Sequence, residues 1–202
     1  MRFIACAILA LGGVAAAAAS VCSCAEAERS GGWCSACDVG YVGSLRLTSK
    51  LLYDEVDAHG HDFDPAKLSC ETCRAALASD GYCERHRRGF VAGRAYVTFL
   101  AYHLAQGGRV EPAELGCTAC RQNARSFGWC QACGQGMIGH VAVKDREVYE
   151  RLAVDYEILI RANERSATCE SCAAAMVLDG TCGRCNVSYR GGKPAPSQPV
   201  KP

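Results

Sequence analysis

Short runs that alternate hydrophobic and polar residues occur three times along the chain, each just after a glycine. The apolar positions are Leu45 and Leu47, Ala95 and Val97, and Val141 and Val143. A period of two places every second side chain on one face of a strand. The preceding glycines suit the turn of a hairpin, and they are Gly43, Gly93 and Gly139, with Gly191 in a fourth, shorter copy. The pattern therefore predicts a series of short β-hairpins.

Each of the first three predicted hairpins leads into a segment with helical periodicity. Thr48 or Ser49 can cap the first helix, which carries Leu52 and Val56 on one face and would end at Gly60. The second begins after Thr98 and would stop at Gly107, with Leu100 and Leu104 four residues apart. Asp64-Pro65 and Glu111-Pro112 each predict a short turn or helix farther along the chain.

The third helix is predicted to be longer, from about Asp145 to Glu164. Its apolar stripe repeats at helical spacing and consists of Val148, Leu152, Tyr156 and Leu159. Glu147–Arg151 and Glu157–Arg161 have the spacing of favourable ion pairs on one helix face.

The cysteines follow the same repeat as the hairpins and helices. The pattern is Cys-x-x-Cys, nine residues, then a second Cys-x-x-Cys. It is complete twice; one copy has His86 in the fourth place, and the first copy has Cys22 one place late. The sixteen residues are Cys22, Cys24, Cys34, Cys37; Cys70, Cys73, Cys83, His86; Cys117, Cys120, Cys130, Cys133; Cys169, Cys172, Cys182 and Cys185. A repeat of this kind predicts tandem modules.

Thiolate and imidazole groups at this spacing suit tetrahedral metal sites, for which zinc is the usual ion. The count favours metal over disulfides. Of sixteen cysteines, Cys6 lies in the N-terminal apolar segment, and the other fifteen cannot all form pairs within the chain. Together with His86 they make four sets of four. Structural disulfides remain the alternative, because cysteine-rich exported chains commonly oxidise.

Two other groups could carry chemistry. His59, His61 and Asp62 could bind a metal, although we favour a polar loop after the first helix. Trp33-Cys34 and Trp129-Cys130 open Cys-x-x-Cys pairs that superficially resemble the thioredoxin active-site sequence. That chemistry needs the pair at a helix N-terminus after a strand, whereas these pairs lead to glycine and a strand-like run. We expect the two tryptophans to shield the metal sites from water.

The paired Cys-x-x-Cys motifs with their glycine turns resemble small zinc-ribbon modules. The resemblance covers 117–133 and 169–185, and less perfectly 70–86 and 22–37, and does not extend to the connecting helices. It implies that each Cys-x-x-Cys turn donates two ligands and that a short hairpin joins the two turns. Because all-Cys zinc sites are closed, they are usually structural.

The remaining features concern location and partners. Residues 1–20 read as a secretory signal, with Arg2, an apolar run and small residues near a cleavage point, so we expect an exported protein, periplasmic or secreted, with no transmembrane span after cleavage. A membrane anchor and a lipoprotein are the alternatives. The formal charge of +1 gives no reason to expect nucleic acid as a partner. We expect an unidentified protein partner.

The sequence thus predicts a small, metal-stabilised α+β protein of four tandem zinc-ribbon-like modules joined by hairpin–helix connectors. The expected boundaries are 1–20 signal, 21–60, 61–110 and 111–165 for the first three copies with their helices, 166–191 for the fourth, and 192–202 for a disordered, proline-rich tail. We expect a non-enzymatic structural or interaction protein with about four zinc ions. Metal buffering or sequestration is the alternative, and thiol–disulfide exchange a weaker one.

Overall fold

Four copies of one small unit make up the protein, as described by a computed structural model that covers residues 22–195. Each unit is a short helix followed by a three-stranded antiparallel sheet, and the first three units continue into a second helix. The chain is therefore a small α+β protein with four separate sheets. The predicted signal segment and residues 196–202 of the predicted tail lie outside the described residues.

A short helix, and not the hairpin implied by the zinc-ribbon resemblance, lies between the two halves of each cysteine pattern. These helices are α1 (Cys24–Ser30), α3 (Glu71–Ala78), α5 (Thr118–Asn123) and α7 (Glu170–Val177). Asp80-Gly81 and Asp179-Gly180 are sequences that also favour a tight hairpin turn, but Asp80 and Asp179 have positive φ angles of 49° and 54° and lie just after α3 and α7. The alanine-rich stretches before them favour helix, so the Asp-Gly pairs end helices.

The predicted hairpins are present in all four copies. The sheets contain β1 (Trp33–Cys34), β2 (Val39–Val42) and β3 (Leu45–Leu47); β4 (Tyr82–Cys83), β5 (Arg88–Val91) and β6 (Arg94–Tyr96); β7 (Phe127–Cys130), β8 (Gln135–Ile138) and β9 (Val141–Val143); and β10 (Thr181–Cys182), β11 (Val187–Arg190) and β12 (Lys193–Pro194). Since β12 pairs with β11, the fourth sheet extends into the range that we assigned to the tail.

The connecting helices begin at the predicted caps. They are α2 (Lys50–Val56), α4 (Phe99–Gln106) and α6 (Arg146–Ser166). The side chains of Ser49, Thr98 and Asp145 accept a backbone N–H bond at 3.1, 3.1 and 2.9 Å respectively. The end predicted for the first helix is wrong: α2 ends at Val56, before Gly60, and the residue after it, Asp57, has a left-handed φ of 56°. Short 3₁₀ helices follow both Asp/Glu-Pro sequences, at Pro65–Lys67 and Pro112–Glu114.

The ion pairs predicted within α6 do not form in the described structure. The Arg151 guanidinium instead lies 2.7 Å from the Glu84 carboxylate of the second copy, and Arg146 pairs with Glu150 at 2.7 Å. A long arginine side chain can reach a neighbouring unit as easily as the next helical turn, and spacing along one helix does not reveal that neighbour.

One packing contact recurs in the first three copies and explains a repeated glycine. A Cβ atom added to Gly40, Gly89 or Gly136 would lie 2.4, 2.2 or 2.1 Å from the Cδ2 atom of a tyrosine. These tyrosines are Tyr53, Tyr102 and Tyr149 of the connecting helices. In the fourth copy Ser188 pairs with Thr181 at the corresponding position of the sheet, and up to residue 195, where the description ends, no connecting helix follows. The glycine is needed where a tyrosine must reach the sheet.

The two tryptophans do not shield the cysteine clusters as expected. The Trp33 ring lies 5.3 Å from Tyr53 and the Trp129 ring 5.3 Å from Tyr149, so both pack on connecting helices. Lys50 lies over Trp33 and Arg146 over Trp129. Adjacent residues of a strand face opposite ways, so each tryptophan points away from the cysteine that follows it.

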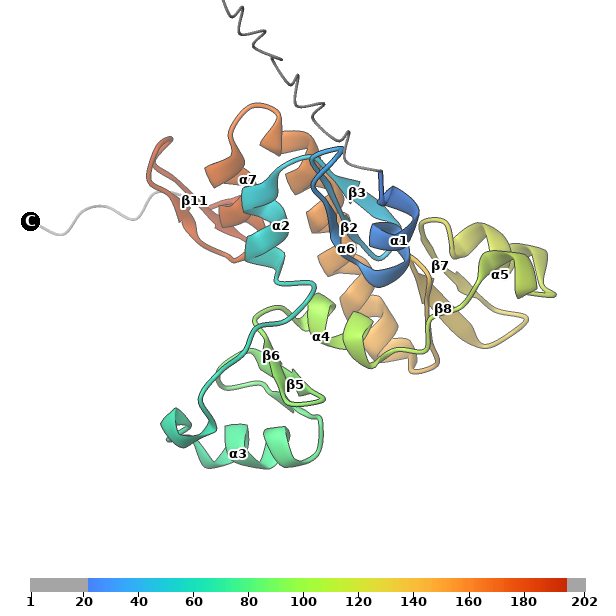
Figure 1. The fold of residues 1–202 in the computed structure, drawn as a ribbon, viewed down its shortest axis with the longest axis horizontal. Coiled ribbons are helices and arrows are strands. Elements are labelled where there is room, and N and C mark those ends of the chain that lie inside the picture. Colours follow the sequence, from blue (N-terminus) through green and yellow to red (C-terminus); the bar gives the residue numbers. More distant parts are fainter. Residues whose placement is uncertain (1–21, 196–202) are drawn as a thin grey trace, which may run out of the picture.

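The largest hydrophobic core surrounds α6, where Leu152, Tyr156 and Leu159 are fully buried. Helices α2 and α7 pack against it. Figure 1 shows α6 crossing the centre of the molecule, with the sheet of the second copy and α3 projecting to one side. The cysteine units of the first three copies each have a small core of their own. Within residues 22–195, no helix combines the length and apolar character needed to cross a bilayer.

Candidate metal centres

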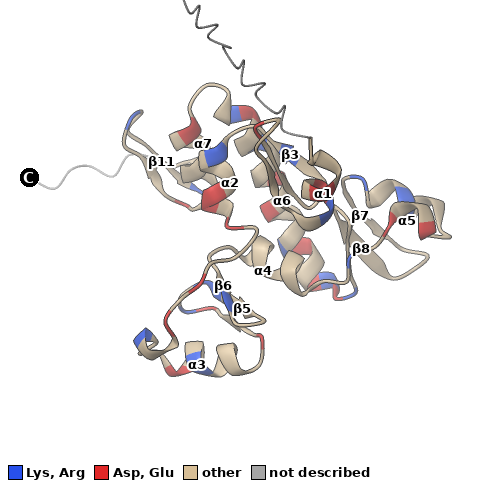
Figure 2. Cartoon of the chain, viewed as in Figure 1, with Lys and Arg blue, Asp and Glu red and all other residues tan. Residues whose placement is uncertain are grey.

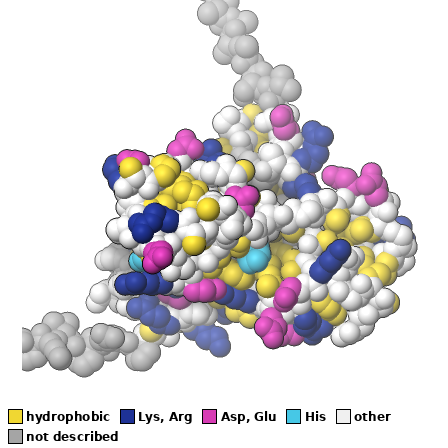
Figure 3. All heavy atoms as spheres, turned by 90° about the horizontal axis from the view of Figure 1, so that it is seen from below, with side chains coloured by type: hydrophobic (Ala, Val, Ile, Leu, Met, Phe, Trp, Pro, Cys, Tyr) yellow, Lys and Arg dark blue, Asp and Glu magenta, His cyan; other side chains and the backbone are white. Residues whose placement is uncertain are grey.

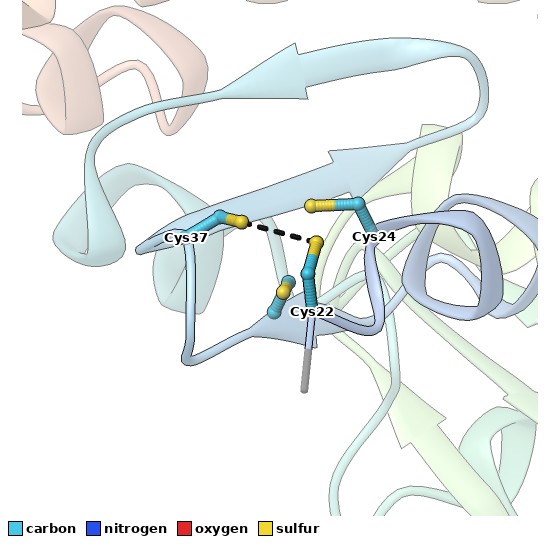
Figure 4. A group of neighbouring side chains, drawn as sticks. Cys22, Cys24 and Cys37 are labelled. Atoms are coloured by element: carbon cyan, nitrogen blue, oxygen red, sulfur yellow. Dashed lines mark hydrogen bonds between the residues drawn. The ribbon is translucent and has the colours of Figure 1, made fainter. Parts of the chain in front are cut away.

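The sixteen predicted ligand residues gather into four clusters, each within one copy. In each cluster the four donor atoms lie within 4.8 Å of one another. The clusters are Cys22, Cys24, Cys34 and Cys37; Cys70, Cys73, Cys83 and His86; Cys117, Cys120, Cys130 and Cys133; and Cys169, Cys172, Cys182 and Cys185. Figure 4 shows the side chains of Cys22, Cys24 and Cys37 pointing toward one another in the first cluster. We number the clusters one to four in chain order.

Helix starts position the first half of three clusters. Cys70, Cys117 and Cys169 are the residues that precede α3, α5 and α7, and the second cysteine of each pair lies in the first turn of the helix. In the first cluster Cys24 itself begins α1, which accommodates the shorter Cys22-x-Cys24 spacing. In the other three clusters two residues lie between the paired donors, and the tight first turn of the helix brings both donors to the same side.

A tight turn after the first strand of each sheet positions the other half of each cluster. The residue that follows the fourth donor has a left-handed backbone in every copy. These residues are Asp38, Arg87, Gly134 and Asn186, with φ angles of 52°, 48°, 60° and 53°. Glycine, asparagine and aspartate tolerate this conformation, whereas arginine adopts it with strain. The turn is thus a property of the cluster and not of one favourable residue.

The distances between donor atoms fit metal coordination better than disulfides. The Sγ atoms of Cys117 and Cys130 are 3.7 Å apart, and those of Cys169 lie 3.9 Å from Cys182 and 3.7 Å from Cys185. A disulfide needs about 2.05 Å, and all fifteen cysteines among the described residues are free. Four thiolates at about 2.3 Å from a tetrahedral zinc ion are roughly 3.8 Å apart. The three separations in the third and fourth clusters are close to that value, whereas Cys22 and Cys37 of the first cluster are closer together, at 3.2 Å.

The second cluster contains an imidazole in place of the fourth thiol. The Nδ1 atom of His86 lies 3.2 Å from the Sγ atom of Cys73 and 3.8 Å from that of Cys83. The ideal separation of nitrogen and sulfur in a tetrahedral zinc site is about 3.6 Å. His86 therefore occupies the fourth donor position, as its place in the repeat indicated.

Local hydrogen bonds lower the pKa of at least one cysteine in each of the first three clusters. The backbone N–H of Cys73 lowers the pKa of Cys70 to about 6, and the backbone N–H of Cys120 lowers the pKa of Cys117 to about 7. In the first cluster the hydroxyl of Ser23 lowers the pKa of Cys34 to about 6. These donors are the free N–H groups of a helix start, or a side chain beside it.

Two other thiols in these clusters, Cys73 and Cys133, hold their protons more tightly. Burial, followed by the neighbouring thiol of Cys83, raises the pKa of Cys73 to about 12. Hydrogen bonding with Cys120 raises the pKa of Cys133 to about 12. Close thiolates repel one another, so four of them ionise together only when a cation neutralises the charge. This proton arrangement is the one expected of a soft-metal site.

The spacing of cysteines did not reveal the side chains that surround the clusters. The amide Nε2 of Gln135 donates to the Cys120 sulfur at 3.7 Å, and the Arg165 guanidinium lies 4.0 Å from the Cys172 sulfur. The hydroxyl of Ser23 lies 3.7 Å from the Cys34 sulfur. Donors of this kind orient ligands and stabilise their charge. Gln135 is two residues beyond Cys133, but nothing in the sequence points to Arg165.

The other predicted candidates do not form a centre of this kind. Asp57 and His61 pair at 2.7 Å, and Asp62 pairs with Arg94 at 3.1 Å, which fits the polar loop that we favoured over a metal site. The Cys-x-x-Cys pairs that follow Trp33 and Trp129 begin at the ends of β1 and β7. The pairs at helix starts are the other halves of the clusters, a position that we did not predict from the sequence.

Comparisons of this chain with protein-family models, with curated proteins and with solved structures give no match.

Proposed function

We propose that this protein is a zinc-binding structural protein in which four ions hold four tandem modules in shape. The observation that carries the proposal is the convergence of sixteen donor atoms in four groups, each within 4.8 Å. Each cysteine unit of the first three copies has only a handful of buried apolar residues. Units of this size rarely fold without a disulfide or a metal, and a structural zinc ion supplies that stabilisation.

Zinc is the proposed ion because the donor sets are three all-thiol clusters and one cluster of three thiols and an imidazole. Such sets complete a tetrahedral shell and leave no position for water. The bound ion supplies positive charge that keeps every thiol deprotonated. We therefore propose a non-enzymatic role, in which the modules present a surface to a protein partner.

Surface composition supports a protein partner over nucleic acid. Lysine and arginine are interspersed with aspartate and glutamate over the helices and strands (Figure 2), and the formal net charge is +1. On the face seen in Figure 3, hydrophobic side chains lie between charged groups of both signs. Leu51, Val154 and Leu178 are exposed by 38%, 56% and 37%. Export remains part of the proposal and depends on residues 1–20.

Elemental analysis together with thiol titration tests the proposal. The full chain, purified from its native compartment, should contain about four zinc ions per molecule and no disulfides. Unfolding in the presence of a chelator should then release the zinc and expose fifteen reactive thiols among the described residues. Seven disulfides and no metal would contradict the proposal.

A second candidate function is metal handling, in which the clusters buffer or transfer metal. One observation favours it: a cavity of about 260 Å³ opens beside the second cluster and is lined by Cys70, Cys73 and His86. A purely structural site needs no such opening.

A further inference from the structure

The second cluster differs from the other three in its donors and in the cavity beside it, and it differs from the fourth in lying outside the main core. We propose that it is the exchangeable metal site of the protein, and that small anionic metal ligands, thiolates or carboxylates, reach it through the adjoining cavity. This inference rests on the proposed metal binding and concerns which of the four sites releases its ion.

The donor set is the first difference. Three thiolates and a neutral imidazole around a divalent zinc ion leave a net charge of about −1, whereas four thiolates leave about −2. An anionic ligand approaching the second cluster therefore meets less repulsion. His86 is also exposed, and its imidazole can leave as a neutral group when an incoming thiolate or carboxylate supplies the replacing electron pair. No oxidation or reduction is involved.

The cavity is the second difference. Its lining includes the ligands Cys70, Cys73 and His86 together with the basic residues Lys67 and Arg88. The ammonium of Lys67 lies 3.9 Å from Asp64 and is 84% exposed, so that pair is weak. Among residues 22–195 the structure gives Arg88 no ion pair. Two cations beside an opening favour the entry of anions.

The rim of the cavity is held in place by the same copy. The Arg74 guanidinium donates to the carbonyl oxygens of Leu68 and Ser69 at 2.9 and 3.2 Å. Both residues line the cavity just before Cys70. These bonds fix the backbone that leads to the first ligand, so the opening persists without a movement of the chain.

The unit that holds the second cluster is also separate from the main core, as are the first and third units. Its small core comprises Cys73, Ala76, Cys83, Phe90 and Ala95. The helix α3 packs on β4 and β5 of its own sheet, and Figure 1 shows this unit projecting from the rest. Metal can leave the second cluster while the main core stays intact.

The test is metal exchange on the full chain loaded with cadmium, followed by cadmium-113 NMR, which separates a site with a nitrogen ligand from all-sulfur sites. Mercaptoacetate, mercaptoethanol and cysteamine serve as anionic, neutral and cationic probes with the same thiol. We expect cadmium at the nitrogen-containing site to exchange about tenfold faster than cadmium at the other three sites. Of the three probes, mercaptoacetate should give the fastest exchange at that site. Equal exchange at four occupied sites would overturn this inference and leave the proposed function intact; absence of bound metal would overturn both.

Two sets of variants separate the donor from the cavity. His86→Cys should slow exchange at the second site about tenfold while keeping four ions bound. The double variant Lys67→Gln, Arg88→Gln retains all ligands. It should slow the metal exchange that mercaptoacetate promotes at the second site, but not the exchange that mercaptoethanol promotes. Cys133→His gives the third cluster the same donor set, as the matched control. If that cluster then exchanged as fast as the second and with the same preference for mercaptoacetate, the role of the cavity would be disproved.

Discussion

The second and fourth clusters have nearly the same cysteine spacing but opposite relations to the rest of the protein. In the fourth cluster Cys169, Cys172 and Cys182 are buried and belong to the main core around α6. The second cluster belongs to a small core of its own. The same cysteine motif can therefore form part of the main core of a protein or belong to a separate unit at its edge.

One position of the following helix accounts for much of this difference. The residue four places after the first cysteine is Ala173 in α7 and Arg74 in α3. Ala173 is fully buried, and α7 packs against both α2 and α6. Arg74 is exposed and bonds to the carbonyls of its own loop. A small side chain permits close approach of helices, whereas an arginine at that place keeps its charge in water.

The largest expected effect comes from removing one buried ligand of the fourth cluster. Cys172→Ser should destabilise the whole protein by at least about 4 kcal/mol, because it empties a site that is continuous with the main core. Thermal unfolding and amide hydrogen exchange of α6 measure the effect. Cys73→Ser is the matched control, and its increased exchange should stay within α3, β4 and β5. Global unfolding of both variants to the same extent would contradict the comparison.

Replacing the glycine that packs against the tyrosine of a connecting helix should have the next largest effect on stability. Gly136→Ala should destabilise by about 2–3 kcal/mol, since its Cβ would meet the Tyr149 ring and displace α6 from its sheet. Ser188→Ala, at the same place of the fourth sheet, should change stability by less than about 0.5 kcal/mol. Denaturant unfolding compares the two. Equal losses would mean that the glycine serves the strand and not the tyrosine.

Residue spacing predicted the local structure well because its signals are local. Ser49, Thr98 and Asp145 cap the helices that their positions indicated. The grouping of donors within a copy also follows from spacing, since short loops cost less entropy to close. The helices between the cysteine pairs were missed because Asp-Gly suits both a hairpin turn and a helix end.

Contacts between copies could not be predicted, because they depend on which units meet. Nothing in the pattern places Arg151 of α6 beside Glu84 of the second copy. Similarly, we expected Trp33 to shield the first cluster, but its partner, Tyr53, lies in a helix twenty residues farther along the chain. A sequence pattern predicts which face of a helix or strand is apolar, but it does not predict which other element packs against that face.

Asp155 gives a smaller, pH-dependent effect where α6 faces the second copy. Burial raises its pKa from 3.8 to about 6, against the lowering influence of Arg151 and Arg87. A raised pKa means that the carboxyl favours folding below about pH 4 and that this contribution is lost as the pH rises through 6. Asp155→Asn should therefore increase stability by about 1–2 kcal/mol at pH 8, with a smaller gain at pH 5. Thermal unfolding at the two pH values measures it. A gain that grows toward low pH would contradict the assignment.

The smallest expected effect concerns the ion pair that attaches the second copy to the centre. The Arg151 and Glu84 side chains are 40% and 68% exposed, so water and salt weaken their attraction. Glu84→Gln should lower stability by less than about 1 kcal/mol, and the loss should vanish at about 1 M salt. Hydrogen exchange should rise in β4 and α4 and not in α7. Glu150→Gln, which removes the pair with Arg146 within α6, is the control and should leave β4 unchanged.

Because Arg151 also lies 3.5 Å from the centre of the Phe99 ring, much of the contact survives loss of the carboxylate. A loss of several kcal/mol would show that charge, and not packing of α4 on α6, holds the two regions together.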